Sequence, residues 1–95
     1  MLFRSQFVYE VMVDWATQDD SGCTTEIYST EEKAIKAFNF EIVQAIQDYG
    51  CFDEESGELE SGWELDKGNH FWELWEDGYY ASNHCTITIT KKEVF

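Results

Sequence analysis

Apolar and polar residues alternate along residues 6–15, which read QFVYEVMVDW. This alternation predicts a β-strand with one strongly apolar face, formed by Phe7, Tyr9, Val11 and Val13. Residues 19–22 read DDSG, which is typical of a turn because Asp and Ser side chains bond their own backbone and Gly accepts a positive φ. Residues 23–28 predict a second strand that pairs back on the first as a hairpin.

The pattern changes to a helical period over residues 30–49. Apolar residues recur there at intervals of three and four and form one stripe along a helix, namely Ala34, Ile35, Phe38, Ile42, Ala45, Ile46 and Tyr49. Ser29 followed by Glu32 has the spacing of a capping box, so the helix is expected to start at about Thr30. Gly50 is suited to end it in a left-handed conformation.

The second half of the chain predicts a loop over residues 51–61 and three more strands, at 62–66, 70–75 and 84–91. A further loop is expected at 79–83. Cys85, Ile87 and Ile89 share one face of the last strand. The order β-β-α-β-β-β predicts a two-layer α+β fold in which one helix packs on an antiparallel sheet. The opposite sheet face is half polar and is expected to be open to solvent.

Composition is consistent with one folded domain over residues 1–95. The chain is 43% hydrophobic and 17% aromatic, which is too apolar for a disordered segment. No apolar run is long enough to cross a membrane, and residues 1–5 lack the apolar stretch of a signal peptide. We therefore expect the protein in the cytoplasm of a host cell.

The charge is the most unusual property of the sequence. Twenty acids face 6 bases, and the net charge is −14. Solubility of a small domain requires a magnitude of only ~2–8, and self-repulsion destabilises the fold. The acids concentrate between residues 48 and 66 and continue at 73–77. A solvated acidic loop is the simplest interpretation. Alternatively, the acids imitate a row of phosphates and meet a protein surface built to bind nucleic acid.

Three cysteines and a histidine form a candidate metal site. In the predicted topology, Cys51 after the helix returns to the sheet end where Cys23 starts the second strand. Cys85 starts at the same end if the last strand pairs with the first. Cys23, Thr25 and Ile27 are expected to face the core, so that Cys23, Cys51, Cys85 and His84 converge on a tetrahedral Cys₃His zinc site. The alternative is that these are small buried hydrophobes with inert thiols.

Catalysis is not predicted. The glycines are scattered turn residues rather than a phosphate-binding loop, and no orienting third group surrounds any pair of Cys and His. Residues 53–64 do not match an EF-hand, because Gly57 stands one position too early. We therefore expect a protein that is not an enzyme.

Short segments of the chain resemble known proteins. The stretch VMVDWATQDDSG at 11–22, followed by STEEKA at 29–34 and WEDGYY at 75–80, is similar to phage proteins of low-GC Gram-positive bacteria. Together with size, acidity and element order, it resembles the small acidic proteins of phages and mobile elements, which include anti-CRISPR inhibitors and anti-restriction DNA mimics. The resemblance implies a target such as a Cas9-type effector, whose nucleic-acid channel is strongly positive.

The sequence thus predicts a stoichiometric inhibitor that occupies a basic, nucleic-acid-binding defence protein, such as a CRISPR effector or restriction enzyme, and does not bind nucleic acid or membrane itself. The expected charged contacts are Glu54, Glu55, Glu58, Glu60, Glu64, Glu73, Glu76 and Asp77, and the expected aromatic anchors are Trp63, Trp75, Tyr79 and Tyr80. Two other classes remain open. One is a zinc-stabilised structural or assembly domain of a phage or mobile element, with incidental acidity. The other is a small enzyme or sequestering protein for a cationic metabolite.

Overall fold

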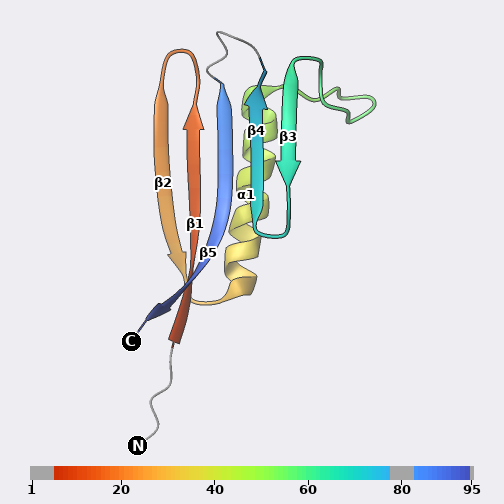
Figure 1. Ribbon diagram of the computed structural model, residues 1–95. Coiled ribbons are helices and arrows are strands. Elements are labelled where there is room, and N and C mark those ends of the chain that lie inside the picture. Colours follow the sequence, from red (N-terminus) through yellow and green to blue (C-terminus); the bar gives the residue numbers. More distant parts are fainter. Residues whose placement is uncertain (1–5, 78–82, 95) are drawn as a thin grey trace, which may run out of the picture.

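The computed structural model describes residues 6–77 and 83–94 (Figure 1). Their element order confirms the predicted β-β-α-β-β-β arrangement. The elements are β1 (Gln6–Ala16), β2 (Ser21–Tyr28), α1 (Glu31–Tyr49), β3 (Trp63–Lys67), β4 (Phe71–Glu76) and β5 (His84–Val94). Most of the loop expected at 79–83 lies outside the described residues.

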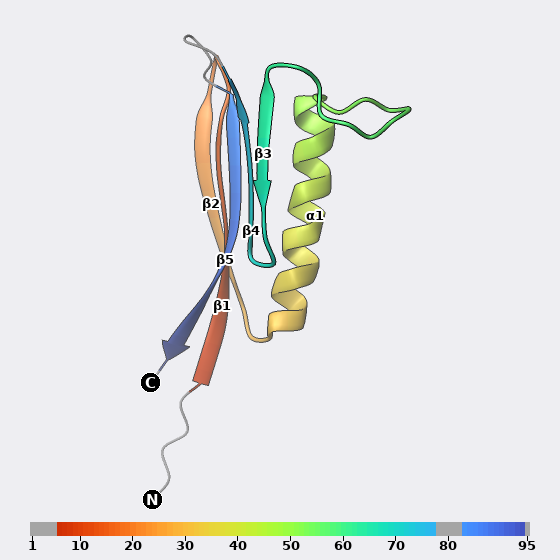
Figure 2. The same cartoon turned by 45° about the vertical axis from the view of Figure 1, so that its right-hand side comes forward.

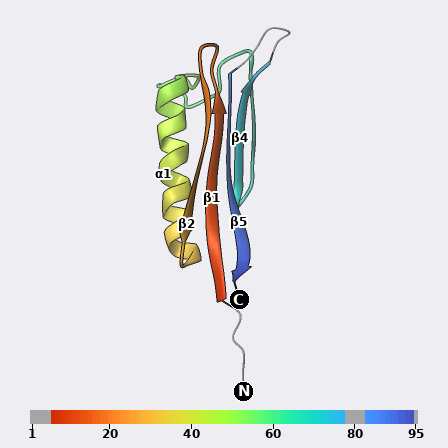
Figure 3. The same ribbon diagram turned by 90° about the vertical axis from the view of Figure 1, so that its left-hand side faces the viewer.

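The strands form one five-stranded antiparallel sheet in the order β2-β1-β5-β4-β3. The last strand of the chain therefore lies in the centre, between β1 and β4. The α1 helix covers one face of this sheet (Figures 2 and 3), which confirms the two-layer α+β fold. Within residues 6–77 and 83–94, no helix or strand covers the opposite face.

The helix begins one residue later than the capping box predicts. Thr30, not Ser29, is the N-cap, and its hydroxyl accepts a hydrogen bond from the Lys33 backbone N–H at 3.2 Å. The third helical residue is then Lys33 rather than Glu32, so no reciprocal capping box forms. Gly50 ends the helix as expected, with φ +60° and its N–H donating to the Ile46 carbonyl.

The core lies between α1 and the central strands. Leu74, Ile87 and Cys51 are the largest fully buried side chains. Their buried neighbours are Val11, Ala34, Phe38, Ala45, Trp72, Cys85 and Ile89. The predicted inward face of β5 is therefore confirmed. Burial of this set supplies the main force that holds the helix on the sheet.

The predicted inward face of β2 was wrong. Cys23 pairs with Asp14 and Gly22 pairs with Trp15, so Gly22 and Thr24 lie on the helix side while Cys23 faces away from it. Ile27, on the same outward face as Cys23, is 55% exposed. The cause is the register, because a slip of one residue sends every side chain of a strand to the other face.

Candidate functional site

The carboxylates gather at one end of the sheet. This acidic end comprises the β1–β2 turn, the last turn of α1, the segment from α1 to β3, and the end of β4 (Figure 1). Its acids are Asp19, Asp20, Asp48, Asp53, Glu54, Glu55, Glu58, Glu60, Glu64, Glu76 and Asp77. The described bases lie away from it, namely Lys33 and Lys36 in the first turns of α1, Lys67 at the end of β3, and Lys91 and Lys92 near the end of β5.

Part of the acidic end is a folded loop over residues 51–62, which projects beside the end of α1 (Figure 2). Cys51 is buried at its base, and Phe52 and Leu59 form a β-bridge above it. The Asp53 N–H donates to the Glu58 carbonyl at 2.8 Å. The loop therefore holds Glu54, Glu55, Glu58 and Glu60 exposed on an anchored backbone.

The Asp53 side chain is used inside this loop. One of its carboxylate oxygens accepts a hydrogen bond from the Glu55 N–H at 2.8 Å, which is an Asx turn. The Gly57 N–H donates to the Asp53 carbonyl at 2.7 Å, and Gly57 has φ +71°. These bonds shape a tight turn.

The protein's own cations do not neutralise the acidic end. In the described part of the chain, the one ion pair that involves a lysine joins Lys92 to Glu10 at 2.7 Å. Lys91 lies 4.1 Å above the ring of Phe7. Both contacts lie at the opposite end of β5, so the negative field of the acidic end is left uncompensated by bases.

The other predicted contact residues divide between the two sheet faces. The open face, which is the sheet face that α1 does not cover, carries Glu64, Glu73 and Trp75. Trp75 pairs there with both Glu64 and His84. Trp63 lies on the helix side and packs edge-to-face on Tyr49, with ring centroids 5.8 Å apart.

Trp63 is half-buried. Glu76, at the end of β4, is also half-buried, and the Asn83 side-chain amide lies 3.4 Å from its carboxylate. Asp77 is exposed next to it, and its N–H donates to the Gly62 carbonyl at 2.7 Å. Tyr79 and Tyr80 lie outside the described residues.

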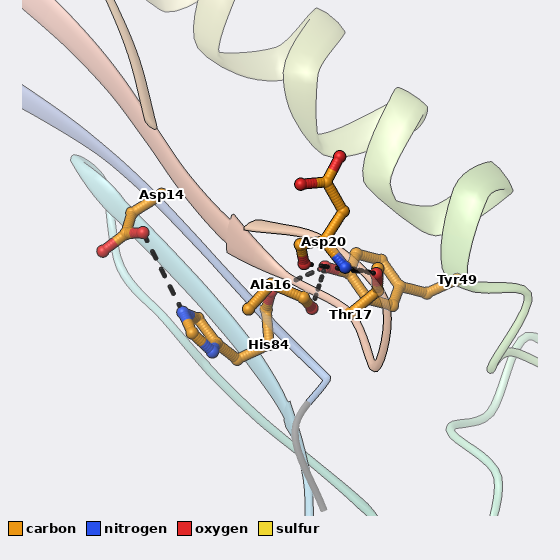
Figure 4. A network of polar contacts seen from close by, with 6 residues as sticks. All are labelled: Asp14, Ala16, Thr17, Asp20, Tyr49 and His84. Carbon is orange, nitrogen blue, oxygen red and sulfur yellow. Dashed lines mark hydrogen bonds and ion pairs between the residues drawn. The ribbon is translucent and has the colours of Figure 1, made fainter. Parts of the chain in front are cut away.

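The four predicted zinc ligands do not converge. Cys51 and Cys85 are buried on the helix side of the sheet. Cys23 is exposed on the open face, and His84 also points to that face, 3.9 Å from Asp14 (Figure 4). The expected convergence is not found, because Cys23 lies on the other face of β2 from the one predicted. Among the described residues, no group of three or more His, Cys, Asp or Glu is placed to hold a metal ion.

Tyr49 connects the end of α1 to the sheet. Its hydroxyl lies 3.0 Å from the Ala16 carbonyl and 2.6 Å from the His84 carbonyl, so it donates across the ends of β1 and β5 (Figure 4). The pKa of this phenol is raised to about 12, mainly by burial and in addition by the negative charges of the Cys85 thiolate and Asp48. Sequence periodicity identified Tyr49 only as a member of the apolar stripe.

A pocket of about 460 Å³ opens between the second half of α1 and strands β1 and β2. Its lining combines an apolar and aromatic floor with a polar rim, and comprises Val13, Trp15, Thr17, Thr24, Glu26, Glu41, Gln44, Ala45, Asp48, Tyr49 and Cys85. The Trp15 indole lies over Gly22, where an added Cβ would come within 2.8 Å of the ring. Gly22 thus lets the indole lie against β2 and form one wall.

The field inside this pocket is negative. The pKa of the Cys85 thiol is raised to about 11, mainly by burial and in addition by the carboxylates of Glu41, Asp14 and Asp48. The thiol is therefore protonated at neutral pH, which makes it a poor nucleophile. The same carboxylates would attract a cation, whereas burial disfavours a charge of either sign.

Sequence reasoning missed this pocket. Glu41, Gln44 and Asp48 follow one another at helical spacing beside the apolar stripe, and this polar stripe was the available signal. Which strand it faces depends on the sheet order.

No family model, curated protein or solved structure was found to match the chain. In the described residues, no helix has the length and apolar character that a membrane crossing requires.

Proposed function

We propose that this protein is a stoichiometric inhibitor that places its acidic end in the nucleic-acid-binding surface of a basic defence protein. The observation that carries the proposal is the segregation of charge: the acidic end holds more than half of the carboxylates and none of the described bases. Evenly scattered acids would serve solubility alone. A field concentrated at one end steers association with a positively charged macromolecule and opposes binding of nucleic acid itself.

The folded acidic loop supports the same proposal. Because Phe52 and Leu59 anchor it, Glu54, Glu55 and Glu58 are presented without the full entropy cost of ordering a free loop on binding. A Cas9-type effector is a suitable target class, because its channel is lined by bases that contact nucleic-acid backbones. Restriction enzymes present the same chemistry. Inhibition arises from occupancy, with no bond made or broken.

The proposal is tested by reversing charge at the two ends. The acidic-loop variant carries Glu54→Lys, Glu55→Lys and Glu58→Lys, and the matched control carries Glu31→Lys, Glu32→Lys and Glu93→Lys. Both change the net charge equally, and all six side chains are exposed. DNA binding by a panel of Cas9-type effectors and restriction enzymes is measured with increasing amounts of each protein.

We expect the acidic-loop variant to inhibit at least about tenfold more weakly, because each reversed contact changes attraction into repulsion. The control is expected to inhibit nearly as the parent protein does. Urea denaturation checks that both variants fold, since acids in the first turn of α1 contribute about 0.3–1 kcal/mol each to helix stability. Full inhibition by a folded acidic-loop variant would refute the mechanism.

A further inference from the structure

The pocket beside α1 has an apolar floor and a negatively charged rim. Its apolar floor is formed by Val13, Ala45 and Cys85, and its lining also includes the aromatic rings of Trp15 and Tyr49. Its rim carries the carboxylates of Glu26, Glu41 and Asp48, and no Lys or Arg is among the described residues that line it. A complementary group needs a positive head and an apolar stem.

The rim carboxylates have no cationic partner among the described side chains. None of Glu26, Glu41 or Asp48 forms an ion pair there. Glu26 accepts a hydrogen bond from the Tyr28 hydroxyl at 2.7 Å, which is a neutral donor. The negative field is therefore available to a group that enters the pocket, and that group gains attraction from several carboxylates at once.

The volume and walls distinguish between possible occupants. About 460 Å³ lies within the ~300–1,000 Å³ range of ligand pockets, so it accommodates a side chain rather than only a bare ion. A neutral apolar group leaves the carboxylates unused, and an anion is repelled. A planar guanidinium stacks on an indole and bonds carboxylates with several N–H groups, which an ammonium cannot do equally well.

We infer that this pocket receives one arginine side chain of the partner protein, with its stem against Trp15 and its guanidinium among Glu26, Glu41 and Asp48. This inference rests on the proposed function, because that function supplies the partner surface from which the arginine comes. The pocket adjoins the acidic end through Asp48 in the last turn of α1. The acidic end thus attracts a basic surface over a distance, and the pocket selects one side chain from it.

The experiment uses the intact protein and two matched probes, acetyl-argininamide and acetyl-citrullinamide. The citrulline probe replaces the guanidinium by a neutral urea of the same shape. Binding is followed by the NMR shift of the Trp15 indole N–H, which a Trp15→Phe variant assigns. We expect a saturable shift with the arginine probe and binding at least about tenfold weaker with citrulline, since the charge interacts with both the carboxylates and the indole.

Two double variants locate the effect. Glu41→Gln with Asp48→Asn removes two pocket charges, and Glu54→Gln with Glu55→Gln removes two from the acidic loop. The pocket variant should weaken arginine binding at least about fivefold, and the loop variant less than about twofold, because exposed charges at a distance are screened by salt.

The inference is overturned if citrulline binds as well as arginine, if both double variants weaken binding equally, or if no saturable shift appears at tens of millimolar probe. Because no partner protein is present, these outcomes remove the pocket's role alone. The effector-binding assay described above separately tests whether the acidic end inhibits at all.

Discussion

The two flanks of α1 differ although they belong to one helix on one sheet. One flank carries Ile35, Ile42 and Ile46, which pack against the core together with Leu65 of β3. The flank toward β2 carries Glu41, Gln44 and Asp48, and there the space is left open as the pocket. The filled flank stabilises the fold because its apolar side chains are buried. The open flank contributes less, because its apolar surface is not covered and its like charges lie close together. Such an arrangement is typical of sites where binding is favoured over stability.

The largest expected effect is the difference in unfolding free energy between a substitution in the packed core and one at the pocket rim. Leu74 is fully buried, whereas Thr24 is exposed at the pocket rim. Leu74→Ala should lower the free energy of unfolding by about 2–5 kcal/mol, because it leaves a cavity in a packed region. Thr24→Ala should change it by less than about 0.5 kcal/mol. Urea denaturation of both variants measures the difference, and equal losses would mean that the two regions are not distinct.

The next effect concerns the pocket wall. Gly22→Ala places a Cβ 2.8 Å from the Trp15 ring, so the indole or β2 must shift. We expect a loss of about 1–3 kcal/mol in unfolding free energy, together with a changed near-UV circular dichroism spectrum. In a Trp15→Phe background the closest ring atoms are missing, so the same substitution should be better tolerated. A double-mutant cycle with no coupling between the two positions would contradict this packing.

The smallest expected effect is a fall in the free energy of unfolding at alkaline pH, and it comes from the Cys85 thiol between the two flanks. The pKa of Cys85 rises from its ordinary value of 9.0 to about 11, first through burial and then through Glu41. Stability from the protonated thiol is fully present below pH 9 and is lost as the pH rises to about 11, because the unfolded chain releases its proton first. The free energy of unfolding should therefore fall across this window.

Two variants check the origin of this pH dependence. Cys85→Ala removes the thiol and should flatten the decline between pH 9 and about 11. Glu41→Gln removes one carboxylate that raises the pKa, so the decline should be smaller than in the parent protein. A decline that is the same in all three proteins would assign it to other groups, such as the Tyr49 phenol, whose pKa is about 12.

The sequence predicted those features that depend on neighbouring residues. The alternation over residues 6–15 and the three-four spacing over 30–49 identified β1 and α1 almost to their ends. The inward face of β5 was also correct, because Cys85, Ile87 and Ile89 are its most apolar alternate set. For β2, the residues SGCTTEIY carry no strong contrast between faces, so the pattern could not decide the register.

By itself, the sequence determined the element order, the two-layer fold and the excess of negative charge, because local periodicity and composition need no partner in space. Tertiary structure alone decided that β5 lies in the centre, that Cys23 faces away from Cys51 and Cys85, and that the polar flank of α1 faces β2. Those outcomes depend on strand register and long-range pairing. The pairings of β5 with β1 and with β4 place it in the centre, and β1 and β5 are far apart in the sequence, so local patterns cannot connect them.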